Sequence, residues 1–95
     1  MGLIIEIQER VPVKSDKVAS RIIDGEAVIV MLERQETIVL NNVGSRIWEI
    51  MDGQKNLNEL ASILTSEFDT TYQQALKDLV EFIEDLAKRE IVTFK

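Results

Sequence analysis

Residues 18–40 read VASRIIDGEAVIVMLERQETIVL and predict three consecutive strands. The dipeptide Asp24-Gly25 tolerates positive φ angles and lies between apolar runs, which is typical of a type I′ hairpin turn. Residues 27–32 are apolar without polar alternation, so we predict a central strand covered on both faces. Residues 37–40 form the third strand after a second turn. Because consecutive strands usually pair, we expect a three-stranded meander with this third strand at an edge.

The segment before the strands differs in character from the rest. Residues 1–16 show no helical periodicity, and Pro12 blocks a helix. We therefore expect an N-terminal arm, residues 1–16, followed by one domain, residues 17–95. An arm of this kind can exchange between protomers, so we expect a monomer or a dimer.

Three helices are predicted after the strands. Asn41 or Asn42 is placed to cap the first helix, and Gly53 is placed to end it in the left-handed conformation. Trp48 lies one position off the apolar stripe of this helix, so we expect it to pack at the rim of the core. Two capping boxes are predicted, at Asn56/Glu59 and at Thr71/Gln74. Strands followed by helices predict an α+β fold, a winged helix-turn-helix-like domain with a three-stranded antiparallel sheet and three helices.

The amino-acid composition limits the kinds of catalytic and metal-binding sites that the chain can form. With 95 residues, 45% of them apolar and 29% charged, the chain is long enough for one globular domain. It has no cysteine and no histidine, which excludes thiolate nucleophiles, catalytic triads and Cys/His zinc sites. No apolar run approaches the ~20 residues of a membrane span. We expect a cytoplasmic protein that is not an enzyme, needs no cofactor and binds neither metal nor membrane.

The net charge of −6, from 11 basic and 17 acidic residues, argues against nucleic-acid binding. Phosphate contacts dominate nucleic-acid affinity, and the sequence contains no basic cluster that could make them. The third predicted helix is itself acidic. A DNA-binding winged helix therefore remains only an alternative, as does a general protein–protein interaction module.

The third helix has an apolar stripe of about 160°, wider than the roughly 100° that one buried face needs. Asp78, Phe82 and Asp85 recur at helical spacing along one edge of this stripe. Such an edge, bordered by acids, predicts a groove for a partner that carries apolar anchors and could also carry a base. The alternative is that a small domain packs this helix on three sides.

The third strand is the second candidate for a binding surface. An edge strand exposes unpaired N–H and C=O groups, which are a template for an added strand. Residues 37–40 contain no proline or lysine to protect the edge. The alternative is that one of the terminal segments covers it.

An ordered set of residues over about 16–94 resembles the PqqD family. This family contains the small peptide chaperone of pyrroloquinoline quinone biosynthesis, and its module recurs as the precursor-peptide recognition element of ribosomally made modified peptides. The residues that carry the resemblance are Leu40-Asn41, Gly44, Ile47-Trp48, Asp52-Gly53, Leu60-Ala61, Leu64, Asp78, Phe82-Ile83, Leu86 and Ile91-Val92.

The resemblance implies a non-catalytic domain that binds the leader of a precursor peptide and presents it to a peptide-modifying enzyme, often of the radical SAM type. It implies that the leader adds as a strand beside the third strand and lies against the third helix. The family's helix aspartate corresponds to Asp78 and its apolar neighbour to Leu79. The implied peptide-binding residues are Glu36, Thr37, Ile38, Val39, Leu40, Leu76, Asp78, Leu79, Phe82, Ile83, Asp85 and Leu86. The resemblance leaves open whether the pathway makes pyrroloquinoline quinone or another modified peptide.

Overall fold

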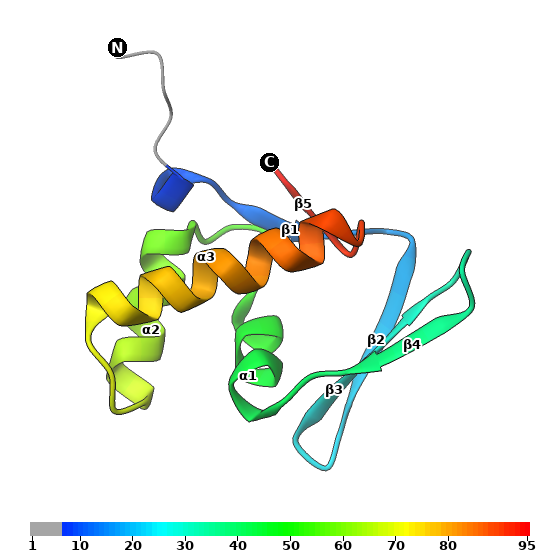
Figure 1. Ribbon diagram of the computed structural model, residues 1–95, viewed down its shortest axis with the longest axis horizontal. Coiled ribbons are helices and arrows are strands. Elements are labelled where there is room, and N and C mark those ends of the chain that lie inside the picture. Colours follow the sequence, from blue (N-terminus) through cyan, green and yellow to red (C-terminus); the bar gives the residue numbers. More distant parts are fainter. Residues whose placement is uncertain (1–6) are drawn as a thin grey trace.

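In the computed structural model, which describes residues 7–95, four strands precede the three α-helices and a fifth follows them (Figure 1). This order confirms the predicted α+β fold with a three-stranded antiparallel sheet and three helices. The elements are the 3-10 helix η1 (Ile7–Glu9), β1 (Pro12–Lys14), β2 (Val18–Ile23), β3 (Glu26–Met31), β4 (Glu36–Val39), α1 (Asn42–Ile50), α2 (Leu57–Glu67), α3 (Tyr72–Lys88) and β5 (Val92–Phe94).

The main sheet has the strand order β2-β3-β4, so the prediction of a central second strand and an edge third strand is confirmed. Asp24 has a φ of 52° and Gly25 a φ of 82°, as a type I′ turn requires. The turn places Ile23 opposite Glu26 and thereby sets the register of the whole hairpin.

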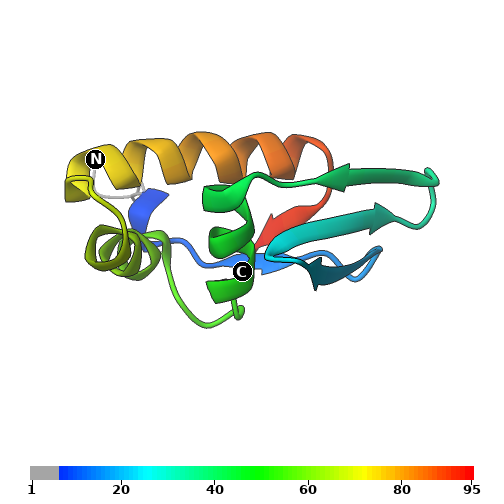
Figure 2. The ribbon, with the colours of Figure 1, turned by 90° about the horizontal axis from the view of Figure 1, so that it is seen from below.

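The prediction that β3 is covered on both faces is wrong. Ala27, Ile29 and Met31 are buried, whereas Val28 and Val30, on the other face, are only partly buried. In Figure 2 the helices lie toward one end of the sheet's strands, and α1 packs against β3. β2 and β4 pair with β3 on its two sides and shield Val28 and Val30 laterally.

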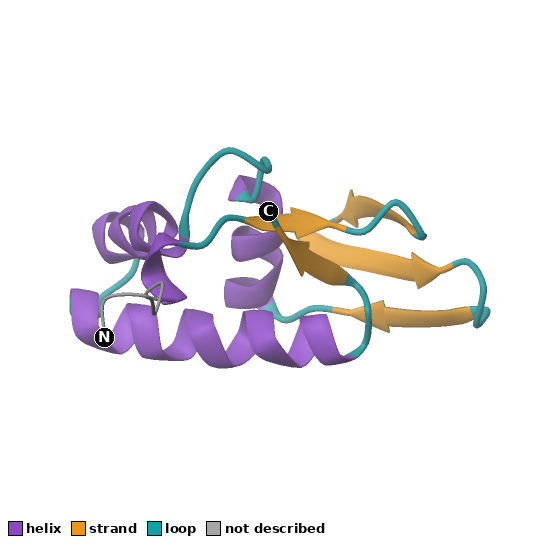
Figure 3. Cartoon of the chain, turned by 90° about the horizontal axis from the view of Figure 1, so that it is seen from above, coloured by secondary structure: helices purple, strands orange, loops and turns teal. Residues whose placement is uncertain are grey.

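A second, two-stranded sheet joins the two ends of the described chain. β1 pairs antiparallel with β5, with Val13 opposite Thr93 (Figure 3). Pro12 is buried, and the amide of Leu57 donates to the carbonyl of Arg10 at 3.0 Å. The described part of the segment that we expected to be an arm is therefore joined to the domain by backbone hydrogen bonds. Residues 1–6 lie outside the described part.

The helix caps follow local sequence rules with two exceptions. Asn41 caps α1, and Asn56 and Glu59 form the predicted reciprocal capping box of α2. Thr71 accepts a hydrogen bond from the Gln74 amide, but the Gln74 side chain turns to Asp78, so the second capping box is incomplete. α1 already ends at Ile50, and Gly53, with a φ of +78°, shapes the turn that follows instead of ending the helix.

Trp48 belongs to the centre of the core, which corrects the prediction of a rim position. Its side chain is 2% exposed, and its indole Nε1 donates to the hydroxyl of Ser20 on β2 at 3.0 Å. The ammonium group of Lys14 lies 4.8 Å from the ring centroid, and burial lowers the pKa of this lysine. The side of α1 that looked peripheral is thus covered by β2 and β1.

Within residues 7–95, no helix combines the length and the apolarity that crossing a bilayer demands.

Candidate functional site

The outer edge of β4 is unpaired among the described residues. The amide of Leu40 donates to the carbonyl of Ala27 at 2.9 Å. Because hydrogen-bonded and non-hydrogen-bonded pairs alternate along an antiparallel ladder, Ile38 also bonds to β3, whereas the N–H and C=O groups of Thr37 and Val39 point to the free edge. The predicted edge strand therefore presents two free amides and two free carbonyls to a partner chain.

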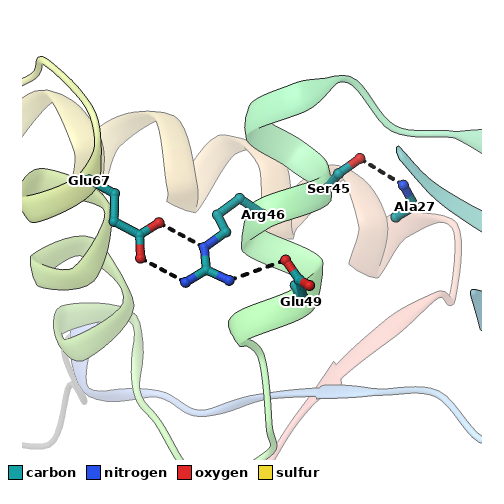
Figure 4. Close-up of polar contacts among 5 residues, drawn as sticks. All are labelled: Ala27, Ser45, Arg46, Glu49 and Glu67. Atoms are coloured by element: carbon teal, nitrogen blue, oxygen red, sulfur yellow. Dashed lines mark hydrogen bonds and ion pairs between the residues drawn. The ribbon is translucent and has the colours of Figure 1, made fainter. Parts of the chain in front are cut away.

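Ser45 fixes this strand to α1 at the point where the chain leaves the sheet. An unbroken ladder would have the Ala27 amide donate directly to the Leu40 carbonyl. Instead, the amide donates to the hydroxyl of Ser45 at 2.8 Å, and the hydroxyl donates to the Leu40 carbonyl at 3.0 Å (Figure 4 shows the first bond). The buried hydroxyl thus continues the ladder by one step and positions the end of β4 relative to the helix.

The apolar α3 residues predicted to bind peptide fall into two groups. Leu79, Ile83 and Leu86 are buried in the core, with exposed fractions of 2% or less. Leu76 and Phe82 are partly buried and pack against that core, so they lie at its boundary. This distribution agrees with the wide apolar stripe predicted for this helix. The residues at the centre of the stripe are buried in the core, and the residues at its edges remain partly accessible.

The two carboxylates of the predicted α3 edge are exposed but differ in their partners. Asp85 pairs with Arg89 at 3.4 Å, one turn further along the helix. Asp78 accepts a hydrogen bond from the side-chain Nε2 of Gln74 at 2.9 Å and has no ion-pair partner among residues 7–95. Of the two, Asp78 is the carboxylate that no basic side chain of the described residues pairs with.

A pocket of about 300 Å³ lies between the three helices, next to the first turn of α1. The sequence prediction missed it, because it is assembled from three helices and a loop, and no periodicity within one helix indicates it. We call it the interhelical pocket. Its lining residues are Val43, Ile47, Leu64, Phe68, Asp69, Thr70, Ala75, Asp78 and Leu79.

An ion-pair network connects α1 to the end of α2 (Figure 4). Nε and Nη2 of Arg46 each donate to one oxygen of Glu67 at 2.7 Å, and Nη1 donates to Glu49 at 3.1 Å. These hydrogen bonds hold the pKa of the Glu67 carboxyl below its ordinary value and raise that of Arg46. The bidentate geometry fixes the direction of the contact as well as its charge.

Residues 26–92 match the family described as Coenzyme PQQ synthesis protein D (PqqD). The chain belongs to this family. The match extends from the start of β3 to β5, so it includes the β4 edge, all three helices and the interhelical pocket of this PqqD-family chain. No curated protein matches the chain.

Two solved structures have a similar fold. The first, described as TbiB1 in complex with the TbiA(beta) leader peptide, is 32% identical, with a TM-score of 0.78 over 83% of this chain and 92% of that one. The second, lasso peptide synthetase B1 complexed with the leader peptide, has a TM-score of 0.79 over 86% of this chain and 96% of that one. At 17% identity, the second shows similarity of fold alone.

Proposed function

We propose that this PqqD-family domain is a non-catalytic peptide-binding module. It binds the leader of a ribosomally made precursor peptide and presents the precursor to a modifying enzyme, of which a radical SAM enzyme is the type we favour. The leader adds as a strand to the free edge of β4 and contacts the accessible edge of α3. The domain contributes affinity and position, and the partner enzyme contributes the chemistry.

The free edge of β4 is the observation that carries this proposal. Thr37 and Val39 present unpaired backbone groups there, and main-chain hydrogen bonds to such an edge supply affinity in strand addition. Membership of the PqqD family supports the same reading. The 32% identical TbiB1, with its TbiA(beta) leader peptide, is a relative in which a leader is bound.

The non-catalytic role agrees with the side chains available. The sequence has no histidine and no cysteine, so the commonest general acid–base and thiolate groups are missing. On α3, Asp85 pairs with the exposed Arg89, and Asp78 accepts a hydrogen bond from the side chain of Gln74, so neither carboxylate is paired with another acid or with a nucleophile.

Hydrogen exchange with and without the leader of the cognate precursor tests the proposal. We expect slower exchange of the Thr37 and Val39 amides at saturating leader, because these amides become hydrogen-bonded. Exchange at β2, the opposite edge of the sheet, serves as the internal control and should not change. Unchanged exchange over residues 36–40 at saturating leader would reject strand addition.

A further inference from the structure

The interhelical pocket lies where β4 passes into α1. Val39, at the end of β4, is 57% exposed, and Val43, in the first turn of α1, is 43% exposed and lines the pocket. Val43 is the fourth residue after Val39, so their Cα atoms are at most about 14 Å apart. An extended peptide that pairs with β4 therefore reaches the pocket within about four further residues.

The walls of the pocket are mostly apolar, and all three helices contribute to them. Ile47, Leu64 and Leu79 are buried core residues that form its floor, and the partly buried ring of Phe68 borders it. Its volume of about 300 Å³ is at the lower end of the range typical of small-ligand sites. The space suits a large apolar side chain better than a polar one, which would lose its hydration there.

Two exposed carboxylates, Asp69 and Asp78, stand among the lining residues, and no basic residue does. Neither carboxylate has an ion-pair partner among the described residues. Arg46 immediately precedes the lining residue Ile47 in the sequence. Its guanidinium, however, is hydrogen-bonded to Glu67 and Glu49. The rim therefore keeps a negative charge that favours a cation beside the apolar group.

We propose that the interhelical pocket is a specificity site for the bound peptide, and that it selects a large apolar side chain next to a lysine or arginine. The inference rests on the proposed function, because it takes the occupant to be the part of the leader that continues beyond the strand paired with β4. Backbone pairing with β4 is insensitive to sequence. The pocket supplies the sequence discrimination that the edge lacks.

The test uses the full 95-residue chain and a phage-displayed library of random 20-residue peptides as the probe. We expect the enriched peptides to share a leucine, isoleucine, methionine or phenylalanine with a basic residue within two positions. In a synthetic copy of the best peptide, replacing the apolar residue by alanine should weaken binding about thirtyfold, as truncation of an interface anchor does.

Two variants of exposed pocket residues test the same site from the protein side. Val43→Lys places a cation at the pocket mouth and should weaken binding about tenfold, whereas Asn42→Lys, on the same turn but outside the lining, should not. Asp78→Asn should weaken binding about two- to fivefold at low salt and less at high salt. Glu81→Gln, on the exposed side of α3, is its control. Thermal unfolding of each variant establishes that the fold is kept.

The outcomes separate the specificity site from the proposed function. Suppose that blocking the free edge of β4 abolishes peptide binding, whereas Val43→Lys and Asp78→Asn bind the peptides as tightly as the unchanged chain. This result would overturn the specificity site and would still support strand addition. Enriched peptides without the apolar–basic pair would do the same. A library that yields no binding peptide would overturn both.

Discussion

The ring of Phe82 lies against Gly44, where α3 crosses the first turn of α1. A Cβ atom at position 44 would stand 3.1 Å from Cε1 of Phe82 and 3.2 Å from Oδ1 of Asn41. Both distances are shorter than ordinary van der Waals contact. The absence of a side chain at Gly44 therefore allows α3 to approach the segment that links β4 to α1.

We predict that Gly44→Ala destabilises the domain by about 1 kcal/mol. Overpacking typically costs ~1–3 kcal/mol, and the higher helix propensity of alanine returns up to about 1 kcal/mol. Urea unfolding measures the change. In a Phe82→Leu background the crowding is relieved, so the same substitution should be neutral or stabilising. Additive effects of the two substitutions would show that the contact is not the cause.

Ser45→Ala should cost about 1–3 kcal/mol of stability, because it leaves the buried amide of Ala27 without an acceptor. Thermal or urea unfolding gives the value. Ser62→Ala is the matched control, since Ser62 is exposed on α2 and should tolerate the change. A Ser45→Ala variant as stable as the control would mean that β4 and β3 close the ladder directly.

Local rules in the sequence were sufficient for the hairpin, the strand order and most of the caps. Asp24-Gly25 has the turn chemistry that its φ angles require, and Asn56 with Glu59 forms the capping box that their spacing indicates. The edge position of β4 followed from sequential pairing alone. In each case the relevant contacts join residues close in sequence.

The remaining features depend on contacts between distant residues. β1 pairs with β5 across almost the whole chain, and neither short strand has a pattern that names its partner. Trp48 is buried because β2 brings Ser20 to its indole, which the helical stripe of α1 cannot reveal. Nothing in the sequence indicated that the side chain of Ser45 is buried, since a serine in the first turn of a helix is ordinarily exposed.

The Arg46–Glu67 pair makes the stability of the α1–α2 contact depend on pH. Since the pKa of Glu67 in the folded state lies below its ordinary 4.5, the ionised pair stabilises the fold above pH 4.5 and loses this effect as the pH falls through the folded-state value. We expect Glu67→Gln to lower the free energy of unfolding at pH 7 and to have a diminishing effect below pH 4.5. Glu84→Gln, at an exposed position without an ion pair among residues 7–95, should have little effect at either pH.

We predict negligible affinity for duplex DNA at physiological salt. The net charge is −6, and α3 carries Asp78, Glu81, Glu84 and Asp85 on accessible positions, so phosphates are repelled. Fluorescence anisotropy with a labelled random duplex at several salt concentrations is sufficient. Micromolar binding that weakens steeply with added salt would contradict the prediction and revive the DNA-binding alternative.

Proline substitutions along β4 separate binding at its free edge from the stability of the sheet. Thr37→Pro removes an amide that points to the free edge, and proline is tolerated on the outer side of an edge strand, so the fold should survive while leader binding weakens at least tenfold. Ile38→Pro removes an amide that bonds to β3 instead, and it should destabilise the domain by about 1–3 kcal/mol, because it leaves the carbonyl of the buried Ile29 without its donor. Isothermal titration with the leader and urea unfolding on both variants make the comparison. If a folded Thr37→Pro variant binds the leader as tightly as the unchanged chain, the leader does not hydrogen-bond to the outer edge of β4.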